Sequence, residues 1–82
     1  MNNESESMRS GLPADPEGMN DKRAAWADAA IRTFQSVTGA DEEDALGDLL
    51  TDLMHWSDRH RFDFNAALDL ARWHYEAETT DY

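Results

Sequence analysis

Carboxylates recur at helical spacing between positions 41 and 58, and they are the side chains of this sequence most able to do chemistry. At about 100° per residue, five polar side chains fall within one narrow sector of a helix; they are Asp41, Asp44, Asp48, Asp52 and His55. No Lys or Arg between Thr33 and Asp58 neutralises them, although like charges four residues apart destabilise a helix by roughly 0.2–0.5 kcal/mol per pair. Such carboxylates can bind a divalent cation, attract a basic protein surface, or form an ordinary solvated face.

The charge of the whole chain favours a positively charged partner. Eighteen acidic and seven basic side chains give a formal net charge of −11 at pH 7. Binding to nucleic acid or to an anionic membrane needs clustered Lys and Arg, so we expect neither as a direct partner. An acidic surface is instead attracted to basic protein surfaces, most of which belong to proteins that bind nucleic acid. A solvated face that keeps the protein in solution is the plain alternative.

We name five of the carboxylates the acidic ridge and expect it to bind the partner; they are Asp41, Glu42, Asp44, Asp48 and Asp52. Carboxylates four residues apart advance about 6 Å along a helix, whereas phosphates along one DNA strand advance roughly 3.4 Å each. The ridge therefore offers a sparser line of charge of comparable geometry. The sharper form of the hypothesis is that it mimics nucleic acid and occupies a basic groove, with His55 beside it.

A second interpretation is a metal-dependent enzyme. Residues 42–50, EEDALGDLL, resemble the acidic helix of the all-α nucleoside triphosphate pyrophosphatases, which hold magnesium with ExxE and ExxD motifs. Carboxylate oxygens are the ligands that magnesium prefers. An ExxD motif that ends at Asp48 needs Glu at position 45, which is Ala45, and the preceding segment offers only Asp21 and Asp28. We therefore expect no catalytic residue, no metal and no cofactor, and keep this activity as an alternative.

Another resemblance covers most of the last forty residues. Its segments are LLTDLMHWSD (49–58), DFNAAL (63–68) and ARWHYEAE (71–78). They resemble a set of short, functionally uncharacterised proteins of bacteria and their phages. The resemblance implies a compact helical unit in a mobile-element setting, where small acidic proteins often inhibit host defence, anti-CRISPR proteins among them. It implies an inhibitor or adaptor that binds another protein, and it supplies no catalytic residue.

The elements that must position these side chains are three helices, predicted at about 21–38, 42–58 and 64–78. Asn20 or Asp21, Asp41 and Asp63 are suitable N-caps, and Gly39 suits the left-handed residue after the first helix. Apolar residues recur every three or four positions in each segment, which is helical spacing. The sequence predicts an all-α, three-helix bundle around one core, with most aromatic side chains inside it.

Trp73 departs from this pattern. It lies away from the stripe of Phe64, Leu68 and Ala71 on the third predicted helix. It either packs on the first helix or stands exposed, and buried or anchoring Trp residues dominate many protein interfaces. We therefore add Trp73 to the candidate partner-binding residues.

The remaining expectations concern the tail and the setting. Residues 1–19 combine Asn, Ser, Glu, Gly and Pro with few apolar side chains, which predicts a disordered acidic tail. The chain has no cysteine and no long apolar run, which favours the reducing cytoplasm and argues against a membrane span. Roughly sixty residues make a marginal core, so a homodimer, or a purely structural dimerising module, stays open.

Overall fold

The computed structural model describes residues 11–81 and contains three α-helices in that range, with no strand. They are α2 (Asn20–Thr38), α3 (Glu42–His60) and α4 (Phe64–Thr79). The predicted all-α, three-helix fold is confirmed, and each boundary lies within two residues of the one expected. Residues 1–10 of the predicted tail lie outside the described residues. Among the residues described, no helix is both long and apolar enough to cross a membrane.

The start of α2 differs from the prediction that Asn20 or Asp21 caps it. Met19 occupies the N-cap position without a side-chain cap bond. Asp15, four residues earlier, instead accepts hydrogen bonds from the backbone N–H groups of Met19 (3.2 Å) and Asn20 (3.3 Å). A turn closed by Gly18 N–H and Asp15 C=O (3.1 Å) allows this reach, so residues 15–19 make defined hydrogen bonds ahead of the helix.

The other helix ends follow local chemistry. Gly39 ends α2 in the left-handed conformation (φ 75°), with its N–H bonded to the carbonyl of Gln35 at 2.7 Å, as predicted. Asp63 caps α4, where its Oδ1 accepts from the backbone N–H of Ala66 at 3.0 Å. Asp41 precedes α3 in an extended conformation but makes no side-chain cap bond. Arg61 ends α3 in the left-handed conformation (φ 61°), which is unusual for a residue with a side chain.

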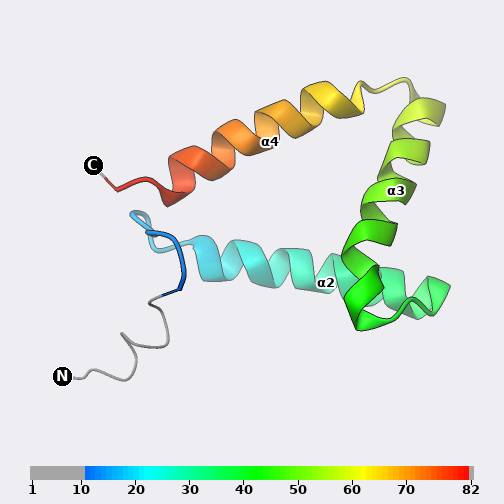
Figure 1. The fold of residues 1–82 in the computed structure, drawn as a ribbon, viewed down its shortest axis with the longest axis horizontal. Helices are drawn as coiled ribbons and strands as arrows, with labels where there is room; N and C mark the ends of the chain where they lie inside the picture. Colours follow the sequence, from blue (N-terminus) through cyan, green and yellow to red (C-terminus); the bar gives the residue numbers. More distant parts are fainter. Residues whose placement is uncertain (1–10, 82) are drawn as a thin grey trace.

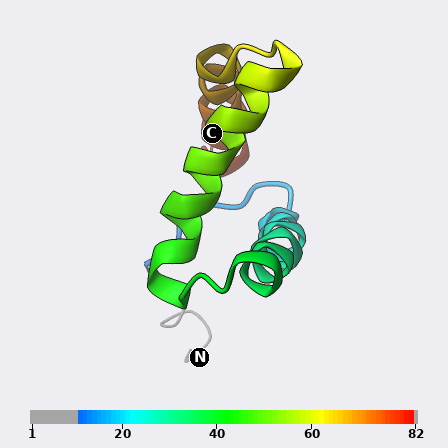
Figure 2. The same cartoon turned by 90° about the vertical axis from the view of Figure 1, so that its right-hand side faces the viewer.

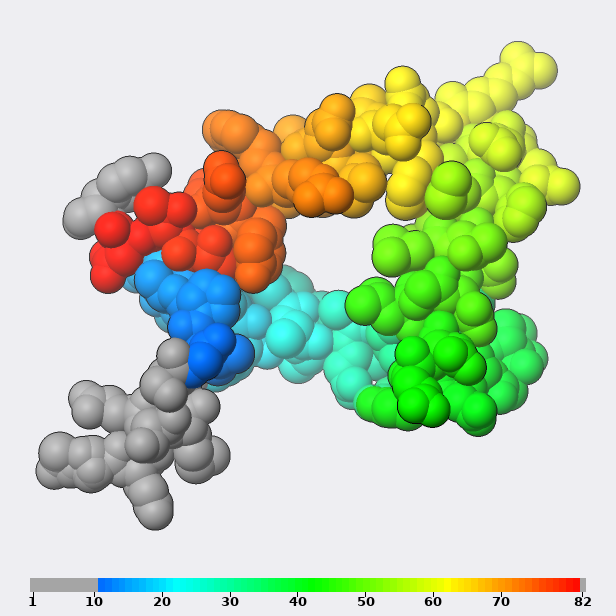
Figure 3. Space-filling model, in the orientation of Figure 1, coloured from blue at the N-terminus to red at the C-terminus, as the bar shows by residue number. Residues whose placement is uncertain are grey.

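The three helices form the sides of an open ring (Figure 1). The amino-terminal half of α3 crosses the carboxyl-terminal part of α2, and α4 starts from the opposite end of α3. Figure 2 views the ring from the side of α3, with α2 and α4 extending away near its two ends. The space-filling view shows an opening between the helices that side chains leave unfilled (Figure 3). The helices therefore meet near their ends and do not pack side by side.

This arrangement corrects the expectation of one shared core. Ala45 is the only buried apolar side chain among the described residues, and Ser57 the only buried polar one. The three tryptophans, expected mostly inside, are 61% (Trp26), 49% (Trp56) and 65% (Trp73) exposed. Short loops predict that consecutive helices lie next to each other, but they do not set the angle between the helix axes. In this chain the angles between the helices leave the apolar stripes exposed.

Candidate protein-binding surface

The acidic ridge lies on α3, and most of it is exposed. Asp44, Asp48 and Asp52 are all exposed, and within residues 11–81 no cationic group lies within ion-pair distance of any of them. Asp41 is also exposed at the N-cap, where its backbone carbonyl accepts from the N–H groups of Asp44 (3.1 Å) and Ala45 (2.9 Å). These four carboxylates are therefore available to solvent or to a partner along one side of the helix.

Glu42, in contrast, has a counter-ion. This corrects the prediction that no carboxylate of the acidic ridge is neutralised by a basic side chain. Its carboxylate accepts two hydrogen bonds from the Arg32 guanidinium on α2, at 2.6 and 3.2 Å. The same guanidinium contacts Asp28 at 3.1 Å and the Gln35 side-chain oxygen at 2.6 Å. The bond from Arg32 lowers the pKa of Glu42, and the two carboxylates raise the pKa of Arg32. The absence of cations within α3 gave no sign of this partner, because it comes from the preceding helix.

Two ridge residues lie beside α2 rather than on a fully open face. Asp48 and Asp52 line a shallow hollow of about 290 Å³ between the helices. Its remaining walls come from both sides of the junction: Phe34, Thr38, Ala40 and Thr51. The hollow is lined by one aromatic ring and by two carboxylates, and neither carboxylate has a counter-ion among the described residues. An Arg or Lys side chain has matching parts, because its stem is apolar and its end is cationic.

His55 and Trp73 lie apart from this hollow. His55 is exposed on the carboxyl-terminal half of α3, where its backbone carbonyl accepts from the Arg59 guanidinium at 3.1 Å. Trp73 is exposed on α4 and contacts the His74 ring edge-on, with centroids 5.3 Å apart. Because α4 leaves from the end of α3 distant from α2, the structure does not bring Trp73 to the ridge (Figure 1). Across residues 11–81, no three His, Asp or Glu side chains are grouped as metal ligands.

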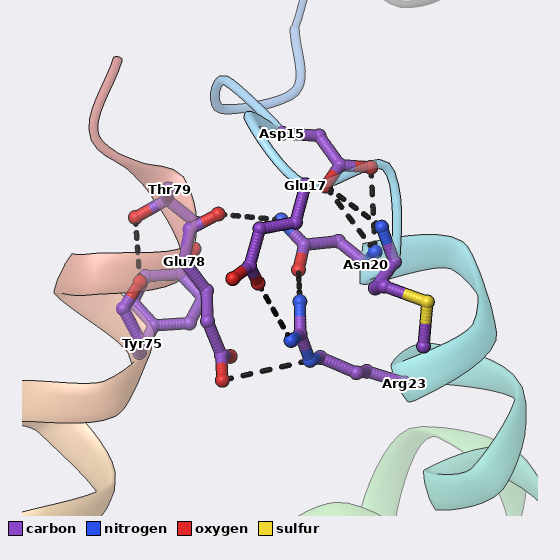
Figure 4. A network of polar contacts seen from close by, with 8 residues as sticks. Asp15, Glu17, Asn20, Arg23, Tyr75, Glu78 and Thr79 are labelled. Carbon is purple, nitrogen blue, oxygen red and sulfur yellow. Dashed lines mark hydrogen bonds and ion pairs between the residues drawn. The ribbon is translucent and has the colours of Figure 1, made fainter. Parts of the chain in front are cut away.

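A second polar cluster joins the two ends of the ring and was not foreseen from the sequence (Figure 4). Asn20 Nδ2 donates to the backbone carbonyl of Glu78 at 2.8 Å. Arg23 bonds Glu17 at 2.9 Å and approaches the Glu78 carboxylate at 3.5 Å. The bond to Glu17, together with the nearby carboxylates, raises the pKa of Arg23. No local pattern signals these contacts, because they depend on where α4 ends in space.

Beside this cluster is a hollow of about 360 Å³. Leu12, Pro13, Ala24 and Tyr75 give it an apolar wall, and the charged and amide groups of the cluster form its rim. The segment before α2 therefore covers part of the seam between α2 and α4. This seam is a structural junction, since its polar groups are paired with one another.

No protein-family model, curated protein or solved structure matches the chain. The surfaces described above are therefore interpreted from their own chemistry.

Proposed function

We propose that this protein is a non-enzymatic inhibitor or adaptor that acts in the cytoplasm by binding a basic protein surface through its acidic ridge. The observation that carries the proposal is the set of exposed carboxylates without a counter-ion in residues 11–81, namely Asp41, Asp44, Asp48 and Asp52. An ordinary exposed helix face mixes both charge signs, and a run of one sign costs helix stability. A cationic partner would offset that cost.

The hollow between α2 and α3 supports an arginine or lysine side chain as the anchoring group of the partner. Its aliphatic stem would lie against Phe34, and its charge would meet Asp48 and Asp52. A charged pair in such a partly shielded place is stronger than one on an open surface, because water screens it less. Electrostatic attraction between a chain of net charge −11 and a basic surface also accelerates their encounter.

The sharper form of the proposal is mimicry of nucleic acid. The ridge would occupy a basic groove of a nucleic-acid-binding protein, such as a CRISPR-type defence protein, and exclude its nucleic acid. Successive ridge carboxylates rise about 6 Å along the helix, so they would meet alternate phosphate positions of one strand rather than every one. The resemblance of residues 49–78 to small phage and bacterial proteins is consistent with this role.

The test begins with capture of partners from a bacterial lysate at low ionic strength and their identification by mass spectrometry. The chain is then titrated into the captured protein bound to fluorescently labelled DNA or RNA. We expect displacement of the nucleic acid, weakening as salt rises because exposed charges are screened. Direct binding without displacement would keep the adaptor form and remove the mimicry.

Charge reversal localises the effect. The triple change Asp44→Lys, Asp48→Lys and Asp52→Lys should abolish binding. The matched control, Glu43→Lys, Asp69→Lys and Glu76→Lys, has the same change in net charge and also alters the first turn of α3. It should retain most of the affinity. Equal losses in both triples, with helicity intact by circular dichroism, would show that only net charge matters and would remove the ridge as the site.

A further inference from the structure

The single chain leaves much of its apolar surface in solvent. Large apolar side chains are exposed on all three helices, including Leu46 (64%) on α3 and Leu70 (56%) and Trp73 (65%) on α4. No described residue of α2 or α4 is buried. Monomeric proteins expose single apolar residues freely, but surfaces of this extent are typical of interaction sites.

The sequence of α4 shows that it needs neighbours on two sides. One apolar stripe consists of Phe64, Leu68, Ala71 and Tyr75, and a second of Ala66, Leu70, Trp73 and Ala77. At about 100° per residue the two stripes lie on opposite faces, and Asn65, Asp69, Arg72 and Glu76 fill one of the arcs between them. A helix with apolar side chains on two opposite faces can bury both faces only between neighbours on two sides. In one chain, α4 is instead an outer side of the ring (Figure 3).

The solvent-accessible surface area of the chain indicates how much surface a partner would have to cover. The chain exposes 6810 Å², whereas a folded monomer of 9.3 kDa exposes roughly 5,000 Å². Even if residues 1–10 contribute the surface of a fully extended segment, roughly 1,600 Å², the rest of the chain exceeds its expected surface by about 700 Å². Each partner in a stable interface loses about 800 Å², and obligate dimers lose more. This minimum excess is therefore close to the area that one partner loses in a standard-sized interface.

We propose that the protein is an obligate homodimer in which α4 of each copy packs its Leu70–Trp73 stripe against exposed apolar side chains of the other copy. The two copies together would form the core that one chain lacks. A second copy is the occupant that the surface favours, because one chain presents both an uncovered apolar helix and the apolar faces that could cover it. Such a self-complementary surface is what a two-fold interface requires.

The charges on the chain are compatible with this pairing. Four carboxylates of the acidic ridge lie on the sector of α3 opposite the stripe of Leu46, Leu50 and Leu53, so contact through the apolar stripes leaves them in solvent; they are Asp41, Asp44, Asp48 and Asp52. Glu42 lies on the side of the stripe. Two chains of net charge −11 repel each other, and salt screens that repulsion. Dimerisation should therefore strengthen as salt rises, whereas binding of the ridge to a basic partner should weaken.

The test uses the full chain, with its mass measured by sedimentation equilibrium over a range of protein and salt concentrations. We expect twice the chain mass, and a melting temperature that rises with protein concentration, because dissociation accompanies unfolding. Leu70→Glu should lower the mass to that of one chain or remove the helical signal in a concentration-dependent manner. Asn65→Glu, with the same charge change on the polar side of α4, should leave the dimer intact.

A single-chain mass at every concentration, with a melting temperature independent of concentration, would overturn the proposal and point to a heterologous partner on this face. An assembly larger than two copies would also contradict it. Neither result bears on the acidic ridge, whose test is displacement of nucleic acid and whose salt dependence has the opposite sign. Failure of the dimer and failure of the proposed function are therefore distinguishable.

Discussion

The side-chain amide of Asn20 donates to the backbone carbonyl of Glu78 across 2.8 Å, although the two residues are 58 positions apart in the chain. The same side chain accepts from the Arg23 guanidinium at 2.7 Å. Asn20 therefore connects the first turn of α2 to the last turn of α4, where carbonyl groups lack partners within the helix. This contact and the neighbouring ion pair of Arg23 with Glu78 close the ring.

Asn20→Ala should loosen that closure. It removes one interhelical hydrogen bond, worth about 1 kcal/mol of unfolding free energy. Because the chain has no cysteine, Lys22→Cys and Glu76→Cys provide specific spin-label sites on α2 and α4. We expect a single narrow distance distribution in the parent, and a longer, broader one in Asn20→Ala, recorded with excess unlabelled chain.

Asn65→Ala is the matched control, since this amide is exposed and forms no hydrogen bond with another described residue. It should leave the distance distribution unchanged. An equally narrow distribution in Asn20→Ala would show that the ring stays closed without this contact.

The contact between Arg32 and Glu42 predicts a pH response. Because Arg32 lowers the pKa of Glu42, this pair stabilises the folded state at neutral pH, and the contribution is lost as pH falls through the lowered pKa. Arg32→Gln should return the Glu42 pKa toward its ordinary range, as measured by a nuclear magnetic resonance titration of the side-chain carboxyl. Arg72→Gln, which removes a distant cation, should leave that pKa in place. An unchanged Glu42 pKa in Arg32→Gln would mean that the pair does not form in solution.

Local chemistry could be predicted from the sequence, and long-range geometry could not. The Asp63 cap and the left-handed Gly39 follow from residue types within four positions of each helix end. The partner of Glu42 is ten positions away in the chain, on another helix, and that of Asn20 is 58 away. Both depend on angles between helices, which short loops leave open.

The missing core has the same cause. Apolar periodicity predicts which side of a helix is buried, but it does not say by what. The stripe of Leu46, Leu50 and Leu53 satisfies that pattern, although these side chains remain 64%, 41% and 40% exposed in the single chain. An apolar stripe that is buried between two copies has the same sequence periodicity as one that is buried in the core of a single chain.

Gly47 is the one glycine inside a described helix, and replacing it should stabilise the protein. A Cβ built at this position meets nothing within 4 Å. Gly47→Ala should therefore raise the unfolding free energy by about 1 kcal/mol through helix propensity alone. Thermal unfolding by circular dichroism at fixed protein concentration checks this, and a shift of roughly 4–8 °C corresponds to that change. Gly39→Ala is the contrasting control, since φ is 75° there, and it should lower the midpoint.

The last prediction concerns Arg61, which has a left-handed backbone conformation (φ 61°, ψ 38°) that is unfavourable for a residue with a side chain. The conformation is required because the Arg61 and Phe62 N–H groups bond back to the carbonyls of Asp58 (3.4 Å) and Ser57 (2.9 Å). Glycine adopts it without the roughly 1 kcal/mol steric cost that a Cβ imposes. Loss of a cation at the helix end offsets part of this gain, by about 0.3–1 kcal/mol.

Comparing Arg61→Gly with Arg61→Ala removes the charge from the comparison, since both variants lack it. We expect the glycine variant to be the more stable of the two by about 1 kcal/mol in thermal unfolding at equal protein concentration. Phe62 should remain stacked on Trp56 in both, because that contact (5.5 Å between centroids) depends on the turn and not on the Arg61 side chain. Equal stability of the two variants would mean that α3 ends without a left-handed residue, and that the turn which sets the direction of α4 differs from the one described.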